Sequence, residues 1–226
     1  MEPLTNYVAE SMKPKSYRDT NKVEELVVNN IFIPFCNQFG LNRVAVTNRD
    51  QFDDIDSVIN NCKIQEKSGI RYSDWVLLEV YNDINPFNEK TRLEGWGLIT
   101  KADYHVFIYR GAKGLNIDWS NVHIAKYESS KIKEVCRLAV ESEEFQDEVA
   151  RIRESIFNRV FDPNKYQSKK IRLDNGTIAF INCNSSELND NNDGTIKYAI
   201  TIKVHKSKLG SKQSLYKYTN DGFKKL

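Results

Sequence analysis

The 226-residue sequence contains no apolar run that approaches the ~20 residues needed to span a membrane. Its first residues, Met-Glu-Pro-Leu-Thr-Asn, lack the basic and apolar regions that make up a signal peptide. These two absences predict a soluble protein of the cytoplasm with no membrane partner.

Cysteine is scarce and dispersed. The four cysteines lie far apart, no Cys-x-x-Cys occurs, and no histidine is near enough to complete a zinc site. We therefore expect reduced thiols in the core. The sequence also lacks Gly-x-x-x-x-Gly-Lys-Ser, Gly-x-Gly-x-x-Gly and Gly-x-Ser-x-Gly, so nucleotide-hydrolysing motors, dinucleotide enzymes and serine hydrolases have no support.

Internal repeats are absent as well, and nothing in the composition demands a second domain. With 40% apolar and 28% charged residues, the chain can bury one sizeable core. We expect a single domain over residues 1–226, with a core at about 21–160 and C-terminal strands and a basic tail at 161–226.

The spacing of apolar residues predicts an order of helices and strands. Residues 21–39 keep a helical period that ends at Gly40, with a bend at Pro34. Strands are expected at 43–47, 52–59, 62–67, 74–81 and 104–109, helices at 129–140 and 143–160, and later strands around Gly176 and at 195–204. This order indicates an α/β domain with a mixed sheet.

The strands at 52–59 and 62–67 are close enough to form a hairpin around Asn60 and Asn61. Side chains two residues apart on a strand share a face, so Gln65 and Lys67 point one way while Glu66 points the other. In such a hairpin Asp56 can face Gln65 and Lys67 across the ladder.

These residues resemble the PD-(D/E)xK nuclease superfamily, in particular its restriction-endonuclease-like and Holliday-junction-resolvase-like branches. The resemblance covers about residues 21–110 and rests on a helix carrying Glu24 or Glu25, an Asp at a strand start and a Gln-x-Lys on the next strand. It implies a restriction-endonuclease-like mixed β-sheet core flanked by helices, with a C-terminal β-rich elaboration. It also implies catalytic roles for Asp56, Gln65, Lys67 and Glu24. Glu66 departs from the pattern, because the family usually has an apolar residue there.

The chemistry expected of such residues is hydrolysis of a phosphodiester. Mg²⁺ or Mn²⁺ would neutralise the scissile phosphate and make a water nucleophilic, held by oxygen ligands from Asp56, Gln65, Asp54 and Glu79. Lys67 would orient the water or stabilise the developing negative charge. The acids around Asp54 can equally form a solvated turn, and Glu79 can equally be the partner of a lysine such as Lys67 or face solvent.

Basic residues gather at the C-terminal end, where residues 201–226 hold seven lysines and one aspartate, interleaved with aromatic residues. Such a segment can follow phosphates and stack on bases, or it can be a solubilising, poorly ordered tail. The lysines expected to bind nucleic acid are Lys203, Lys206, Lys208, Lys212 and Lys217.

Two smaller features lie ahead of the expected strand at 104–109. Gly95 and Gly97 allow a tight turn around Trp96, and Asp103 can cap a strand or pair near the site. His105 and His123 each stand alone in a strand-like stretch, and both are expected to be structural residues rather than ligands.

Two functions are compatible with these patterns. The first is a metal-dependent endonuclease that cuts DNA, with a homodimer as a possible arrangement for cutting both strands. The second is a catalytically inactive nuclease-fold module that binds nucleic acid or a protein partner.

Overall fold

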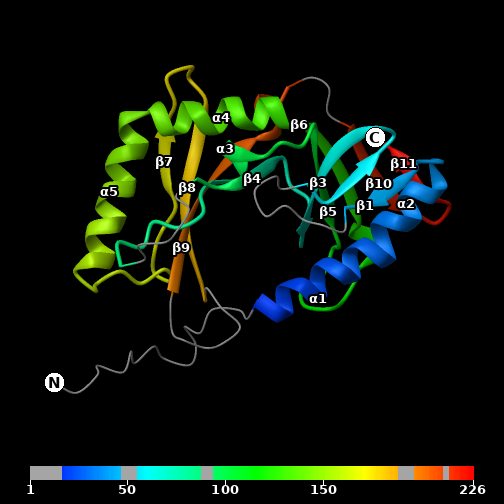
Figure 1. Cartoon of the computed structure of the whole chain (residues 1–226), viewed down its shortest axis with the longest axis horizontal. Coiled ribbons are helices and arrows are strands. Elements are labelled where there is room, and N and C mark those ends of the chain that lie inside the picture. The colour runs from blue at the N-terminus through cyan, green and yellow to red at the C-terminus, as the bar shows by residue number, and fades with distance from the viewer. Residues whose placement is uncertain (1–16, 47–54, 88–93, 188–195, 211–213) are drawn as a thin grey trace.

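The computed structural model describes residues 17–46, 55–87, 94–187, 196–210 and 214–226 (Figure 1). Asp54 and Lys212 lie outside these ranges. The helical elements are α1 (Tyr17–Val27), η2 (Val28–Phe32), α2 (Ile33–Gln38), α3 (Trp96–Ile99), η3 (Trp119–Asn121), α4 (Ser129–Glu141), α5 (Glu143–Phe157) and η4 (Lys206–Lys208). The strands are β1 (Arg43–Ala45), β2 (Ser57–Ile59), β3 (Cys62–Gly69), β4 (Trp75–Tyr81), β5 (Tyr104–Tyr109), β6 (His123–Glu128), β7 (Lys169–Arg172), β8 (Ile178–Glu187), β9 (Ile196–His205), β10 (Ser214–Thr219) and β11 (Gly222–Lys225).

The larger sheet has seven strands in the order β1-β2-β3-β5-β6-β10-β11. Its β3 and β5 run parallel, whereas every other neighbouring pair is antiparallel. The predicted α/β class with a mixed sheet is therefore confirmed.

The second sheet has four antiparallel strands in the order β4-β9-β8-β7. It joins β4, from the first half of the chain, to the strands that follow α5. The remaining C-terminal strands, β10 and β11, extend the larger sheet instead, because β10 pairs with β6. The alternative of a poorly ordered tail is thus wrong for the described part of residues 201–226, which lies mostly in paired strands.

The helix predicted at 21–39 is continuous but changes its winding before Pro34. Proline has no N–H and its ring crowds the carbonyl four residues earlier, which strains an α-helix. The chain passes through the π-helical turn η2, where the Ile33 N–H donates to the Val28 carbonyl, and Pro34 falls in the first turn of α2. Gly40, with φ of +62°, ends the helix as expected.

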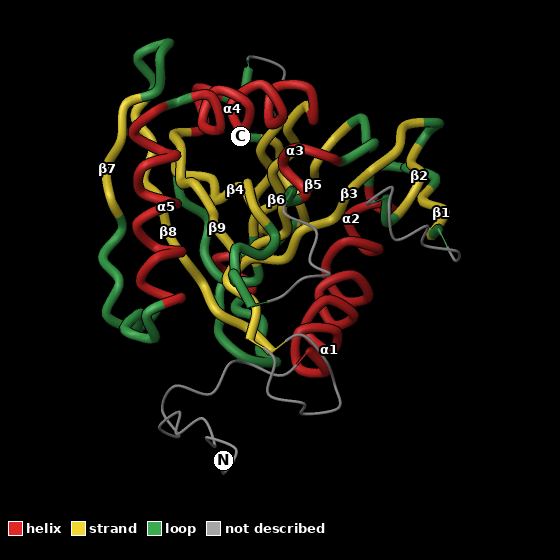
Figure 2. Tube along the Cα trace, turned by 60° about the vertical axis from the view of Figure 1, so that its left-hand side comes forward, coloured by secondary structure: helices red, strands yellow, loops and turns green. Residues whose placement is uncertain are grey.

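Two apolar cores cover the two faces of the larger sheet. On one face, α1, η2 and α2 pack Val27, Ile31 and Phe35 against Ile64 of β3. On the other face, α4, α5 and the second sheet enclose Phe107 and other buried residues. Figures 1 and 2 show α1 across the first sheet and α4 and α5 beside the second.

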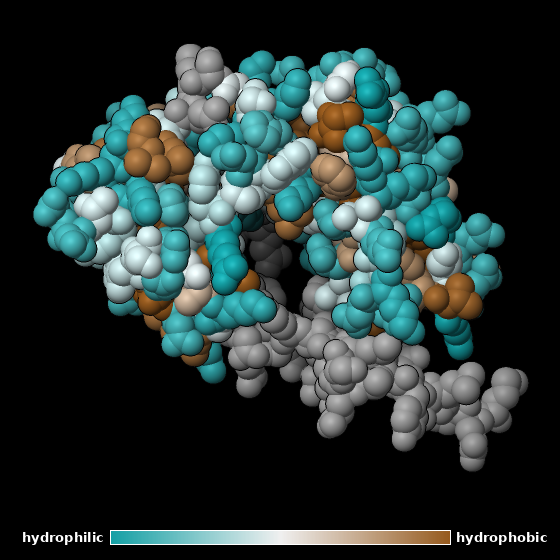
Figure 3. Space-filling view, turned by 180° about the vertical axis from the view of Figure 1, so that it is seen from behind, coloured by the Kyte–Doolittle hydropathy of each residue, from teal (hydrophilic) through white to brown (hydrophobic). Residues whose placement is uncertain are grey.

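The side seen in Figure 3 is mostly hydrophilic, and apolar residues appear there in separate small groups. Among the described residues, no helix combines the length and the apolar character that crossing a membrane requires.

Candidate active site

The β2–β3 hairpin brings Asp56 to Gln65. Its two-residue turn consists of Asn60 and Asn61, with φ of +48° and +67°, a conformation that asparagine tolerates better than most residues. The Asp56 N–H donates to the Ile64 carbonyl at 2.9 Å, and the Asp56 Oδ2 accepts the Glu66 N–H at 2.7 Å. Asp56 therefore bonds to the residues on both sides of Gln65, and the predicted hairpin is confirmed.

Gln65 is buried with an acceptor left over. Its side chain is 1% exposed, and its Oε1 accepts no hydrogen bond from any described residue. A buried polar atom normally has a hydrogen-bond partner, because burying it without a hydrogen bond costs about 1–3 kcal/mol. The Gln65 oxygen is thus suited to a group that the chain itself does not supply.

His105 lies directly beside Gln65 in the parallel pairing of β3 and β5. Its Nδ1 is 2.8 Å from the Ser129 Oγ, whereas its Nε2 is a second buried atom without a described partner. Burial lowers the pKa of His105 to about 3, and the positive charges of Lys67 and Lys133 add to this effect. The imidazole is therefore neutral near pH 7, and it stands beside the candidate site.

Lys67 shares the face of Gln65, two residues further along β3. Its Nζ lies 5.0 Å from the centre of the Trp96 ring, a cation–π contact. The Trp96 ring is also 4.9 Å from the His105 ring. Trp96 therefore links Lys67 to the buried polar pair of Gln65 and His105.

Trp96 also meets Glu79 of β4. The Trp96 N–H points to the Glu79 Oε1 at 3.5 Å, and α3 packs closely on β4 at this point. A Cβ at position 97 would lie 2.6 Å from the Glu79 carbonyl oxygen and 2.5 Å from the Cys136 Sγ, so only glycine permits this approach. Lys67 and Glu79 are thus both placed at Trp96, although they come from different sheets.

Glu66 points to the opposite face and has a structural role. Its carboxylate accepts two bonds from Arg43, both at 2.9 Å, and one from the Ser57 hydroxyl at 2.5 Å. Only 6% of its side chain is exposed. A carboxylate at this buried position is explained by the ion pair with Arg43 and the bond from Ser57, which join β1, β2 and β3.

The other acids predicted for the site are placed as follows. Glu24 belongs to α1, which packs on the sheet face opposite to Gln65 and Lys67. Asp54 lies outside the described residues. Asp103 caps the start of the parallel pair, because its Oδ2 accepts the Lys63 N–H at 2.8 Å and its own N–H donates to the Lys63 carbonyl. Within the described ranges, no group of three or more His, Cys, Asp or Glu side chains could hold a metal ion.

The C-terminal lysines within the described ranges lie on β9, in η4 and on β10 and β11. Lys206 is paired with Asp74 at 2.7 Å and donates to the Tyr72 hydroxyl at 2.8 Å, and these two bonds raise the pKa of Lys206. Lys203 on β9 and Lys208 in η4 are exposed. Lys217 of β10 lies opposite His123 of β6, and Lys212 falls outside the described ranges.

Strand pairing places some of these basic residues on the face of Gln65 and Lys67. One row across this face runs through directly paired residues, namely Lys224, Lys217, His123, Tyr109 and Gly69. The adjacent row contains Lys67 and Phe107, and the next contains Gln65 and His105. Lys217 therefore lies on the same side of the sheet as the candidate site.

No family model, curated protein or solved structure matches this chain.

Proposed function

We propose that the protein is a metal-dependent endonuclease that hydrolyses phosphodiester bonds in DNA. The observation that carries the proposal is the buried Gln65 Oε1, to which no residue in the described ranges donates a hydrogen bond. Gln65 stands between the two residues that Asp56 bonds, and it shares its sheet face with Lys67. This arrangement is the one expected from the resemblance to the PD-(D/E)xK nucleases.

Two of the proposed ligands, Gln65 and Asp56, offer oxygen atoms of the kind that a small divalent cation accepts. Mg²⁺ and Mn²⁺ prefer oxygen ligands, and the Gln65 Oε1 and the Asp56 carboxylate lie on neighbouring strands. In this proposal Asp54 and Glu79 supply further oxygens, whereas Glu24 lies on a helix that covers the opposite face of the sheet and is not among the ligands. When bound, the ion neutralises phosphate charge and lowers the pKa of a water.

Lys67 is the residue that we assign to stabilising developing negative charge. Its ammonium is held over the Trp96 ring, which limits its positions without neutralising its charge. A cation fixed before the reaction stabilises a transition state more effectively than one that must reorganise. His105 and Trp96 support this geometry from β5 and α3.

DNA is proposed as the substrate, with Lys203, Lys206, Lys208, Lys212 and Lys217 as residues that bind its backbone. Lys217 supports this proposal best, because it shares a sheet face with Lys67. Phosphate contacts of this kind add affinity in a salt-dependent way. A homodimer would place two such sites on opposite strands and is part of the same proposal.

One observation favours the alternative, an inactive nuclease-fold module that binds nucleic acid or a protein partner. The Asp56 Oδ2 already accepts the Glu66 N–H, and Gln65 contributes a neutral amide where a second carboxylate would attract a cation more strongly.

The test is cleavage of supercoiled plasmid, linear duplex and single-stranded DNA with Mg²⁺ or Mn²⁺, with EDTA as the metal control. We expect Asp56→Ala and Lys67→Ala to lower the cleavage rate ~100-fold or more, because each removes charge stabilisation of the transition state. DNA affinity should change much less. Lys170→Ala is the matched control, since Lys170 is exposed on β7.

Metal-dependent cutting that persists in Lys67→Ala would refute the assigned chemistry. If the protein binds DNA in a salt-sensitive way but cuts none of the substrates with either metal, the alternative function as an inactive binding module is supported instead.

A further inference from the structure

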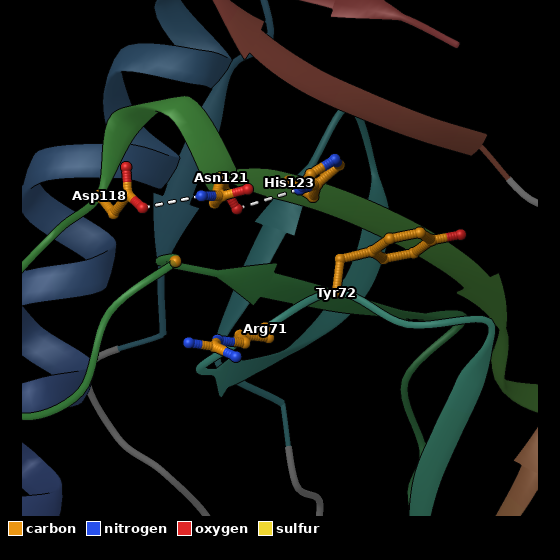
Figure 4. Close-up of a pocket in the computed structure, with 6 residues that line it drawn as sticks. Arg71, Tyr72, Asp118, Asn121 and His123 are labelled. Atoms are coloured by element: carbon orange, nitrogen blue, oxygen red, sulfur yellow. Dashed lines mark hydrogen bonds between the residues drawn. The ribbon is translucent and has the colours of Figure 1, made fainter.

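A pocket of about 310 Å³ opens beyond the ends of β3 and β5. Its lining residues, shown in Figure 4, are Arg71, Tyr72, Gly111, Asp118, Asn121 and His123. The carboxyl ends of parallel strands are the usual place for a ligand in an α/β sheet, and β3 and β5 form the parallel pair here. The volume is in the range that accommodates a small organic ligand.

One wall of the pocket is aromatic. The rings of Tyr72 and His123 stack at 5.0 Å with 21° between their planes, and Tyr72 meets Tyr109 edge-on at 5.6 Å. Burial lowers the pKa of His123, a bond to the Asn121 carbonyl opposes the shift, and the charge of Lys217 adds to it. Because the imidazole and the phenol ring already stack on each other, a planar ligand would extend this stack as a third ring.

The opposite wall is polar and rigid. Ser120 donates to the Asp118 carboxylate from its N–H and its hydroxyl, and the Asn121 Nδ2 donates to it at 2.8 Å. These bonds, first those from Ser120 and then that from Asn121, lower the pKa of Asp118. They also fix the Asn121 carboxamide, whose Oδ1 receives no hydrogen bond from a described residue.

Gly111 allows the chain after β5 to lie directly against the Asp118–Asn121 turn. Its φ is +79°, and a Cβ there would lie 2.5 Å from the Asp118 carbonyl oxygen and 3.0 Å from the Asn121 Cβ. Only glycine accommodates both the backbone conformation and the contact.

Positive charge surrounds the aromatic wall. Arg71 is exposed at the pocket, Lys217 lies opposite His123 in the ladder, and Lys206 donates to the Tyr72 hydroxyl at 2.8 Å. Aromatic rings beside cationic side chains are the combination that binds single nucleotides of a strand, since bases stack and phosphates pair with the cations.

We propose that this pocket binds one unpaired nucleotide of a DNA strand. The base extends the stack of Tyr72 and His123 from the His123 ring and meets the Asn121 carboxamide, while its phosphate is held by Arg71 and Lys217. This inference rests on the proposed endonuclease function and specifies its substrate class. His123 shares the sheet face of Lys67, and it lies two strands across and two residues along from it. The spacing of strands and the rise per residue put the two Cα atoms about 12 Å apart. The preferred DNA therefore carries an unpaired nucleotide close to the phosphate that is cut.

The test is a binding measurement in EDTA with the fluorescent base 2-aminopurine, whose emission falls on stacking. Three probes are compared, namely a duplex with one extrahelical 2-aminopurine, the same base in a fully paired duplex, and the free 2-aminopurine nucleotide. We expect about tenfold tighter binding of the extrahelical probe than of the paired one, with quenching, from the worth of one stacked base.

Variants identify the residues responsible. His123→Ala should abolish the tenfold preference, His123→Phe should retain it because a ring remains, and Arg71→Ala should weaken binding of the extrahelical probe. Arg153→Ala is the matched control, because Arg153 is an exposed arginine on α5.

Equal affinity for the paired and extrahelical probes, or a preference that survives His123→Ala, would overturn the inference. If the free nucleotide binds tightly while the two duplex probes bind equally, the pocket takes a free nucleotide and not a nucleotide of a DNA strand, which would overturn the inference. The binding measurement contains no metal and does not depend on cleavage. A preference for the extrahelical probe without any cutting in the plasmid assay would therefore count against the proposed function alone. Cleavage lost in Lys67→Ala together with equal probe affinities would count against the inference alone.

Discussion

At the scale of single residues, the structure separates side chains that serve stability from those that do not. Glu66 and Gln65 are consecutive, yet Glu66 has three hydrogen bonds to its carboxylate whereas the Gln65 Oε1 has no described partner. Proteins accept unfavourable local features where function requires them. Of the four described residues with an unpartnered buried side-chain atom (Gln65, His105, Arg110 and Thr177), Gln65 is the functional candidate because it shares its sheet face with Lys67 and neighbours the residues that Asp56 bonds.

A substitution at Gln65 tests this separation. Gln65→Leu removes a buried amide oxygen that has no described partner, at similar side-chain volume, so we expect the free energy of unfolding to rise by about 1 kcal/mol while metal-dependent cleavage is lost. Urea denaturation in EDTA measures the first effect, and the plasmid assay the second.

Gln38→Leu provides the matched control. The Gln38 side chain accepts from the Phe223 N–H and donates to its carbonyl, both at 2.8 Å. We expect the free energy of unfolding of this variant to fall by about 1 kcal/mol. A comparable loss in Gln65→Leu would show that Gln65 is satisfied in solution and is held for stability.

At the scale of elements, the short helix α3 connects the two sheets. It carries Trp96 between Lys67 on β3 and Glu79 on β4, and Gly97 sets the depth at which it packs. The position of Lys67 therefore depends on a glycine that it does not touch.

Gly97→Ala should move α3 away from β4. The added methyl meets a backbone carbonyl oxygen and a buried sulfur, so we expect a loss of about 1–3 kcal/mol in unfolding free energy, measured by urea denaturation. Combining it with Cys136→Ala should restore only part of this loss, because the contact with the Glu79 carbonyl remains. Full stability in the single variant would show that α3 is not tightly packed here.

At the scale of the whole molecule, a buried carboxylate on α5 adds an ionic link to the second sheet beside the apolar core that they share. Glu148 of α5 is 1% exposed and receives bonds from Arg151, Lys169 of β7 and Tyr166. Burial by itself would raise the pKa of Glu148, but these three donors outweigh it and hold the pKa below its usual value.

This shift predicts how stability depends on pH. A carboxylate whose pKa is lowered by folding stabilises the protein above its unfolded pKa, about 4.5, and loses that contribution as the pH falls through the folded value. Glu148→Gln should lower the unfolding free energy at pH 7 by about 2 kcal/mol and reduce its decline below pH 4.5. Glu154→Gln, at an exposed position of α5, is the control. Parallel pH profiles for Glu148→Gln and the parent protein would contradict this role.

Local patterns of the sequence determined the α/β class, the long first helix, the β2–β3 hairpin and the common face of Gln65 and Lys67. These features follow from periods of two and 3.6 residues and from asparagines that accept positive φ, all of which act within a few neighbouring residues. Only the tertiary structure decided that β4 leaves the sheet to pair with β9, that β10 joins β6, and that His105 stands beside Gln65. It likewise created the pocket at Tyr72 and His123. Such pairings join residues far apart in the chain, and the buried contacts that select among possible partners exist only once the chain has folded.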